Sequence, residues 1–135
     1  MAPHLLICVS FHGYGHIGQT APVLASLRER LPGLRVTVRS SAPGFKLSER
    51  LGTAIERQRA EVDVGMVQRT ALEVDIDATA SAYRAFHEDW STRVAVEADT
   101  LRRLRPDLVL ANVPYLSLAA ANQAEIPGVA LCSIC

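Results

Sequence analysis

Two histidines, His12 and His16, lie four positions apart within the glycine-rich segment 10–19, which reads SFHGYGHIGQ. Histidine is the side chain best suited to proton transfer near neutral pH. A histidine beside a bound hydroxyl group can remove its proton, whereas a loop that only cradles phosphate groups needs no histidine. We therefore take His16, which comes just before the first expected helix, as the candidate catalytic base.

The glycines of the same segment permit a second interpretation. Gly13, Gly15 and Gly18 have the G-x-G-x-x-G spacing of dinucleotide-binding loops, between an expected strand and an expected helix. An NAD site also needs an acidic residue at the end of the second strand. That place holds Arg39 and Ser41 instead, in VRSSAP, and an arginine there suits NADP. An NADP-binding Rossmann domain is therefore kept as an alternative.

Strands and helices alternate along the chain. The expected strands occupy 4–10, 34–40, 54–58, 107–113 and 128–134; the expected helices occupy 17–31, 45–51, 78–105 and 115–125, and 60–76 is a long loop. Near-continuous apolar strands that alternate with helices form a parallel sheet covered on both faces. We expect residues 1–135 to form one α/β domain, a doubly wound parallel sheet of Rossmann type.

Particular residues are expected to begin these helices or to fill the core. Pro22 suits the first turn of the first helix, where its missing N–H costs little. Asp77 or Thr79 can cap the start of the long helix. The cysteine spacing forms no disulfide framework, so all three thiols are expected to pack in the core. They are Cys8, Cys132 and Cys135.

Ligands of doubly wound sheets bind beyond the carboxyl ends of the strands. Loops 11–16, 40–44 and 112–116 meet at that edge, so we expect residues of these loops to contact a substrate. The catalytic candidates are His16 and Asn112. The candidate substrate-binding residues are His12, Gly13, Tyr14, Gly15, Ser41, Pro114 and Tyr115. No metal site is expected, because the polar residues of FHEDW in the long helix spread around its circumference.

The charge balance excludes other classes of partner. The chain has 14 basic and 14 acidic residues and no net charge, so neither nucleic acid nor an anionic membrane surface is an expected partner. The first residues, MAPHLLICVS, lack the basic region of a signal peptide, and no apolar run has the length of a transmembrane span. We expect a cytoplasmic protein.

The segment HGYGHIGQTAPVLASL resembles the first loop and helix of GT-B glycosyltransferases, the two-domain nucleotide-sugar transferases. It is more closely similar to the glycosyltransferase-like segment fused to some plant sugar kinases of the L-arabinokinase type, and to bacterial predicted glycosyltransferases. The resemblance runs through most of the chain, and it includes SSAPGF, MVQRTALEVD and RPDLVLANVP in the same order.

This resemblance implies the N-terminal half of a GT-B enzyme, which holds the acceptor, a sugar or another small molecule. The nucleotide-sugar donor would bind to a C-terminal domain that these 135 residues do not contain. We therefore expect a fragment that has no cofactor of its own and is inactive alone. His16 falls where many family members have the general base, and His12 matches an earlier loop histidine of the kinase-fused group.

Asn112 departs from the pattern of the relatives that use a His–Asp pair, because it stands where they have the aspartate. An amide can accept the imidazole N–H and orient the ring, but it has no charge to stabilise the imidazolium. In the Ser-His-Asp triad of serine proteases, the change from Asp to Asn lowers kcat by about 10⁴-fold. His16 then works without a carboxylate, or another acid supplies one, or catalysis is weak. A non-catalytic sugar-binding or regulatory module is therefore a further alternative.

Overall fold

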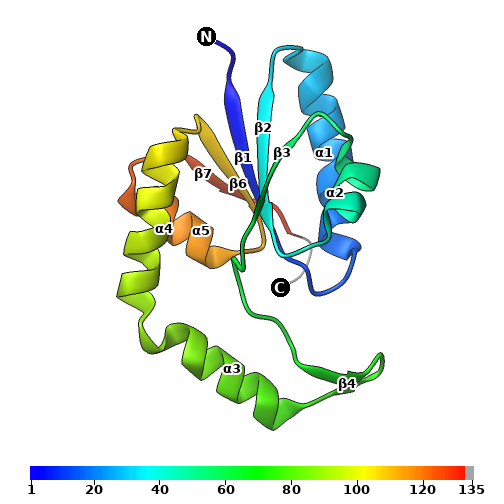
Figure 1. The fold of residues 1–135 in the computed structure, drawn as a ribbon, viewed down its shortest axis with the longest axis vertical. Coiled ribbons are helices and arrows are strands. Elements are labelled where there is room, and N and C mark those ends of the chain that lie inside the picture. Colours follow the sequence, from blue (N-terminus) through cyan, green and yellow to red (C-terminus); the bar gives the residue numbers. More distant parts are fainter. Residues whose placement is uncertain (133–135) are drawn as a thin grey trace.

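Short apolar strands form the centre of the protein. A computed structural model of the chain describes residues 1–132. Five strands make one parallel sheet in the order β3-β2-β1-β6-β7 (Figure 1). The strands are β1 (His4–Val9), β2 (Arg35–Ser40), β3 (Glu56–Arg59), β6 (Leu108–Asn112) and β7 (Gly128–Ala130). All six residues of β1 are buried, as a strand with neighbours on both edges and helices on both faces requires.

Two pairs of helices cover the two faces of the sheet (Figure 1). On one face, α1 (Gly15–Arg30) and α2 (Gly44–Leu51) pack against Leu5, Ile7 and Val9 of β1. On the other, α4 (Trp90–Leu104) and α5 (Tyr115–Gln123) pack against Leu6 and Cys8. Successive side chains of a strand point to opposite faces, so β1 contributes to both cores. The predicted doubly wound α/β fold is confirmed.

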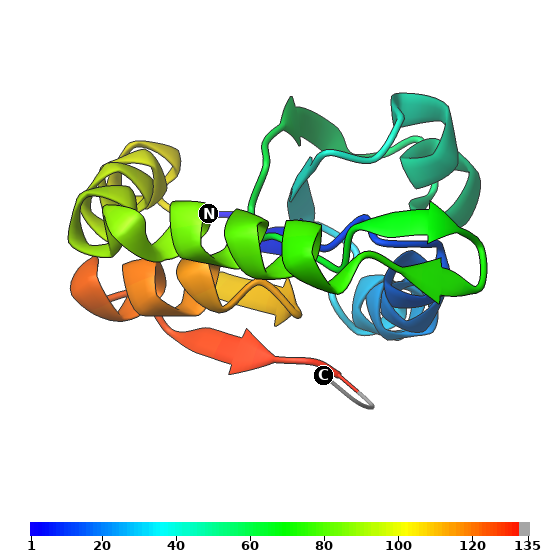
Figure 2. The same cartoon turned by 90° about the horizontal axis from the view of Figure 1, so that it is seen from below.

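The predicted helix over 78–105 is two helices, α3 (Ile76–Glu88) and α4. Asp89 separates them, with φ −113° and ψ 44°, outside the helical region. Aspartate is a poor former of helix interiors. The break directs α3 away from the sheet, whereas α4 buries Ala98 and Leu101 against it. Figures 1 and 2 show that α3 lies beyond the carboxyl ends of the strands.

The starts of two helices also differ from the prediction. Helix α1 already begins at Gly15, so Pro22 lies inside the helix and not in its first turn. The N-cap of α3 is Asp75, whose side chain accepts a hydrogen bond from the backbone N–H of Ala78 at 2.9 Å. The expected caps, Asp77 and Thr79, are therefore wrong, because the helix starts before them.

Part of the predicted loop over 60–76 is a small antiparallel hairpin of β4 (Gln68–Thr70) and β5 (Glu73–Val74). Arg69 lies 2.9 Å from the Asp75 carboxylate and 3.8 Å from that of Glu73, so charge pairs hold the hairpin to the start of α3. Strands this short leave no periodic pattern of apolar residues, which is why the sequence did not reveal them.

The last strand is shorter and more exposed than predicted. β7 ends at Ala130, before Leu131 and Cys132 of the expected 128–134, and positions 133 and 134 lie outside the described residues. All three residues of β7 are exposed, and within the described part of the chain it pairs with β6 alone. Cys132 is exposed, so the expectation that it packs in the core is wrong. Cys8 is buried as predicted, and burial raises the pKa of its thiol to about 12. Cys135 lies outside the described residues.

Candidate functional site

A pocket of about 330 Å³ lies beyond the carboxyl ends of β1 and β6. His12, His16 and Val113 line it from the loops that follow these two strands. Residues 63–66 and Gln68 line a second side, and Tyr83 of α3 and Tyr115 of α5 complete the wall. The pocket therefore gathers titratable and aromatic side chains from four separate parts of the chain at the predicted ligand edge of the sheet.

The loop between β1 and α1 presents both histidines. Gly13 has φ +131°, a conformation that side-chain-bearing residues rarely adopt, so the sharp turn between the histidines depends on glycine. His12 precedes this turn, and His16 lies in the first turn of α1. The glycines therefore bring both imidazole rings to the same pocket.

His16 and Asn112 form the hydrogen-bonded pair that was expected. His16 Nδ1 lies 2.9 Å from Asn112 Oδ1, and the asparagine is fully buried at the end of β6. Asn112 Nδ2 faces the His16 carbonyl at 3.0 Å and the Thr20 hydroxyl at 3.2 Å. An amide donates through nitrogen, so its oxygen faces the imidazole and accepts from Nδ1–H. In the neutral form of the ring, this contact places the proton on Nδ1 and leaves the lone pair on Nε2.

Asp63 is a carboxylate in the pocket that the sequence interpretation missed. Its Oδ1 lies 3.1 Å from His12 Nε2, and its Oδ2 accepts a hydrogen bond from the Ser10 hydroxyl. Ser10 Oγ accepts in turn from the backbone N–H of Val113 at 3.2 Å. The hydrogen bond and the charge of Asp63 raise the pKa of His12, although partial burial of the ring opposes them. The carboxylate thus partners His12, not His16.

One sequence signal could have pointed to Asp63. It is a single charged residue within the apolar segment VDVGMV, residues 62–67, which is otherwise part of an aperiodic stretch. The glycine of this segment has a structural reason, because a Cβ on Gly65 would lie 2.2 Å from His12 Nδ1. Only glycine at 65 lets the backbone approach the ring this closely.

Tyr115 is held in place by a second histidine-containing cluster. Its hydroxyl lies 3.0 Å from His87 Nε2, and His87 Nδ1 lies 2.8 Å from the backbone carbonyl of Tyr83. The carbonyl only accepts, so Nδ1 of His87 donates to it and Nε2 accepts from the tyrosine O–H. The rings of His87 and Tyr115 stack with their centroids 5.7 Å apart, and the centroid of the Trp90 ring lies 5.5 Å from that of Tyr115. Burial is the main cause that raises the pKa of Tyr115.

The remaining predicted contacts take other positions. Tyr14 is exposed at the N-cap of α1, between Gly13 and Gly15 of the same loop. Pro114 is buried at the N-cap of α5. Ser41 directly follows β2 and does not line the pocket. The structure therefore brings His12, His16 and Tyr115 to one pocket, with Asn112 behind His16, and places loop 40–44 outside its wall.

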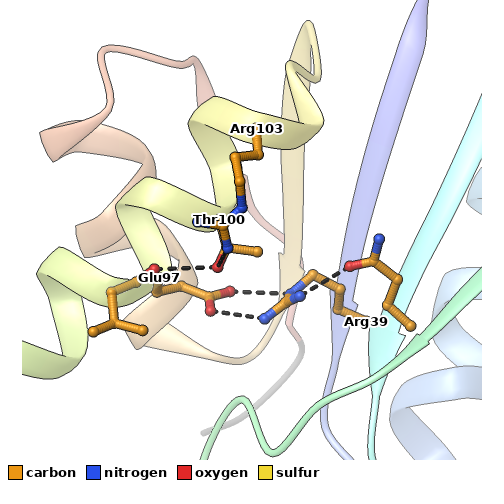
Figure 3. Close-up of polar contacts among 6 residues, drawn as sticks. Arg39, Glu97, Thr100 and Arg103 are labelled. Carbon is orange, nitrogen blue, oxygen red and sulfur yellow. Dashed lines mark hydrogen bonds and ion pairs between the residues drawn. The ribbon is translucent and has the colours of Figure 1, made fainter.

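Arg39 forms an ion pair with Glu97 inside the fold (Figure 3). Its guanidinium donates to both carboxylate oxygens of Glu97 on α4, at 3.2 and 2.8 Å, and to Gln58 at 3.0 Å. The side chains of Arg39 and Glu97 are 12% and 10% exposed. The arginine that would hold the 2′-phosphate of NADP is therefore neutralised and directed toward α4.

Two negative findings apply to residues 1–132, the described part of the chain. No helix there combines the length and the apolar character needed to cross a bilayer. No group of three or more His, Cys, Asp or Glu side chains there is arranged to hold a metal ion.

No protein-family model matches the chain, and no curated protein matches it in sequence. Solved structures do resemble it. A proposed UDP-N-acetylglucosamine 2-epimerase from Listeria monocytogenes matches 97% of the chain with a TM-score of 0.60 and 11% identity. A ugt transferase from Siraitia grosvenorii in complex with UDP matches 96%, with a TM-score of 0.57 and 16% identity. MurG from Acinetobacter baumannii matches 95%, with a TM-score of 0.54 and 16% identity.

The chain spans 30%, 28% and 34% of the lengths of these three proteins. Identities this low establish likeness of fold and do not transfer an activity. The parallel five-stranded sheet with helices on both faces matches the Rossmann-like half of such proteins. The chain has a GT-B glycosyltransferase-like fold.

Proposed function

We propose that the chain is the acceptor-binding half of a nucleotide-sugar-dependent glycosyltransferase. The observation that carries this proposal is the pair of imidazole rings, His12 and His16, at one pocket beyond the carboxyl ends of β1 and β6. Each ring has one nitrogen tied to a fixed partner, which leaves the other nitrogen to meet an acceptor hydroxyl. The finer resemblance to L-arabinokinase-type segments and the cytoplasmic location stay predictions.

His16 is the first candidate for the base. Asn112 holds its Nδ1–H, so Nε2 has the lone pair that can take a proton. In the proposed step, the acceptor hydroxyl gives its proton to one of the two pocket imidazoles, His12 or His16. Its oxygen forms a bond to the anomeric carbon of the donor, and the bond from that carbon to the nucleoside diphosphate breaks. A separate domain of the protein would hold the donor.

The pocket wall favours an acceptor with an apolar face. Val64, Met66 and Val113 line the pocket together with Tyr83 and Tyr115, and none of the lining residues that the structure describes is a lysine or an arginine. A ring that stacks on a tyrosine while its hydroxyl group reaches an imidazole would satisfy both kinds of contact.

Two other functions remain distinguishable. NADP binding loses its main support, because Arg39 is paired with Glu97. A non-catalytic sugar-binding module is favoured by one observation, the neutral amide of Asn112 in place of a carboxylate behind His16. Such a module would bind an acceptor but would not release nucleoside diphosphate from a donor.

The test uses the full protein that contains this chain. Release of nucleoside diphosphate is measured with a panel of UDP-sugars and hydroxylated acceptors. We expect release that requires an acceptor and is lost in the double variant His12→Gln/His16→Gln. The variant Glu61→Gln, which changes an exposed acid, serves as the control and should keep the wild-type rate. Acceptor-dependent release by the double variant at the wild-type rate would refute the proposal.

A further inference from the structure

We propose that His12 and Asp63 form the proton-transfer dyad of the pocket, and that Asp63 supplies the carboxylate missing at Asn112. This inference rests on the proposed function and specifies which histidine takes the proton. His12 is then the catalytic residue and Asp63 a positioning residue that acts through it. His16, held by the neutral amide of Asn112, hydrogen-bonds the acceptor without becoming an imidazolium.

Asp63 is fixed at both oxygens. Oδ1 accepts from His12 Nε2–H at 3.1 Å, and Oδ2 accepts from the hydroxyl of Ser10, at the end of β1. The Ser10 oxygen is held by the Val113 N–H at 3.2 Å, so the chain of contacts runs into the loop after β6. The Asp63 side chain is only 9% exposed. A carboxylate whose two oxygens each accept a hydrogen bond keeps its orientation toward the ring.

Gly65 packs over the face of the His12 ring and does not cover the lone pair of Nδ1. A Cβ at this position would lie 2.2, 2.3 and 2.6 Å from Nδ1, Cγ and Cδ2 of the ring. Three such similar distances place that point over the face of the imidazole, not along the lone pair of Nδ1. With Nε2–H donated to Asp63, Nδ1 is the nitrogen that can accept a proton, and the side chain is 34% exposed at the pocket.

Charge decides between the two histidines. The proton of an acceptor hydroxyl turns the imidazole into a cation while the oxygen–carbon bond forms. At His12 this cation faces the Asp63 carboxylate, whereas at His16 it faces only the Asn112 carbonyl oxygen. A carboxylate favours the charged form of a neighbouring imidazole, and a neutral amide does so far less. The raised pKa of His12, caused first by the hydrogen bond to Asp63, agrees with this difference.

The pH dependence of sugar transfer follows from the same contacts. The titratable groups that line the pocket with His12 are Asp63, His16, Tyr83 and Tyr115. Activity requires neutral His12, so it rises with pH through the raised pKa of this residue. Removing the Asp63 charge should move the acid limb of the kcat profile to lower pH and lower its plateau.

The test combines kinetics with NMR titration of the histidine ring protons in the full protein. Asp63→Asn and His12→Gln should each lower kcat by about 10²- to 10⁴-fold. KM should stay within about threefold, and His16→Gln should cause a smaller loss of kcat than either. Glu61→Gln is the matched control. In Asp63→Asn, the pKa of His12 should fall, because the hydrogen bond and the charge of Asp63 raise it in the wild type.

Three outcomes overturn the inference. The first is a His12 pKa in Asp63→Asn that equals the wild-type value. The second is a larger loss of kcat in His16→Gln than in His12→Gln. If Asp63→Asn does not fold, His12→Gln still decides, because it leaves Ser10 and Asp63 in contact. The third outcome is the absence of sugar transfer by the wild type, which overturns the proposed function together with the base role of His12. The NMR titration then still reports whether Asp63 and His12 are coupled.

Discussion

Replacing Glu97 with alanine is expected to destabilise the fold strongly, because it leaves the Arg39 guanidinium buried without a counter-charge (Figure 3). Two hydrogen bonds join the pair, at 3.2 and 2.8 Å, and both side chains are close to 10% exposed. Among the described residues, Gln58 is the only other side chain that accepts a hydrogen bond from the guanidinium, and an amide cannot neutralise the charge.

Removing one member of a buried ion pair costs about 3–5 kcal/mol, whereas replacing both members with apolar residues is often neutral. We expect about 3 kcal/mol for Glu97→Ala, since each side chain keeps a little contact with water. For a domain of this size that corresponds to a fall in Tm of about 10 °C. The double variant Arg39→Met/Glu97→Leu should stay within about 1 kcal/mol of the wild type.

Urea unfolding followed by circular dichroism measures these differences. Glu49→Ala is the matched control, because it breaks an exposed ion pair with Lys46, 3.1 Å long, in α2. This change should cost less than about 1 kcal/mol. If Glu97→Ala costs no more than Glu49→Ala, or if the double variant is as unstable as Glu97→Ala, the desolvation argument fails.

The remaining predictions concern the site and the thiols. With a pKa of about 12, the buried Cys8 should resist iodoacetamide at pH 8 in the native protein while the exposed Cys132 is alkylated; peptide mass spectrometry that finds native Cys8 modified contradicts this. Asn112→Asp should lower the free energy of unfolding by about 2 kcal/mol or more at pH 7.5. The reason is that a buried carboxylate oxygen would then face the His16 carbonyl and the Thr20 hydroxyl, which now meet the amide N–H₂. An unchanged urea midpoint counts against this prediction. His12 has a pKa raised above 6.5, so its pairing stabilises the fold fully below pH 6.5 and is lost as pH rises through the folded-state value. The stability advantage of the wild type over His12→Gln should therefore shrink from pH 5.5 to pH 9 in urea titrations, and an advantage that grows with pH would be the wrong sign. Gly65→Ala should displace the His12 ring and lower its pKa in an NMR titration, since the new Cβ would lie 2.2 Å from Nδ1; an unshifted titration would show that the ring has another position available.

Local patterns predicted most of the fold. The apolar run of β1, the glycine turn after it and the apolar face of α1 are neighbours in the chain, so their residue types reveal them directly. The pairing of His16 with Asn112 also followed, because parallel strands end at one edge of a sheet. The break at Asp89 did not, since the apolar spacing on its two sides is compatible with a single helix.

The sequence by itself determined the order of strands and helices, the glycine loop with its two histidines, and the amide opposite His16. Only the tertiary structure decided which histidine has a carboxylate. Asp63 lies 51 positions after His12, in a stretch with no periodic pattern, and its place depends on the path of that backbone over Gly65 and Ser10. Contacts made by aperiodic segments are set by packing against the rest of the fold, so local residue patterns do not specify them.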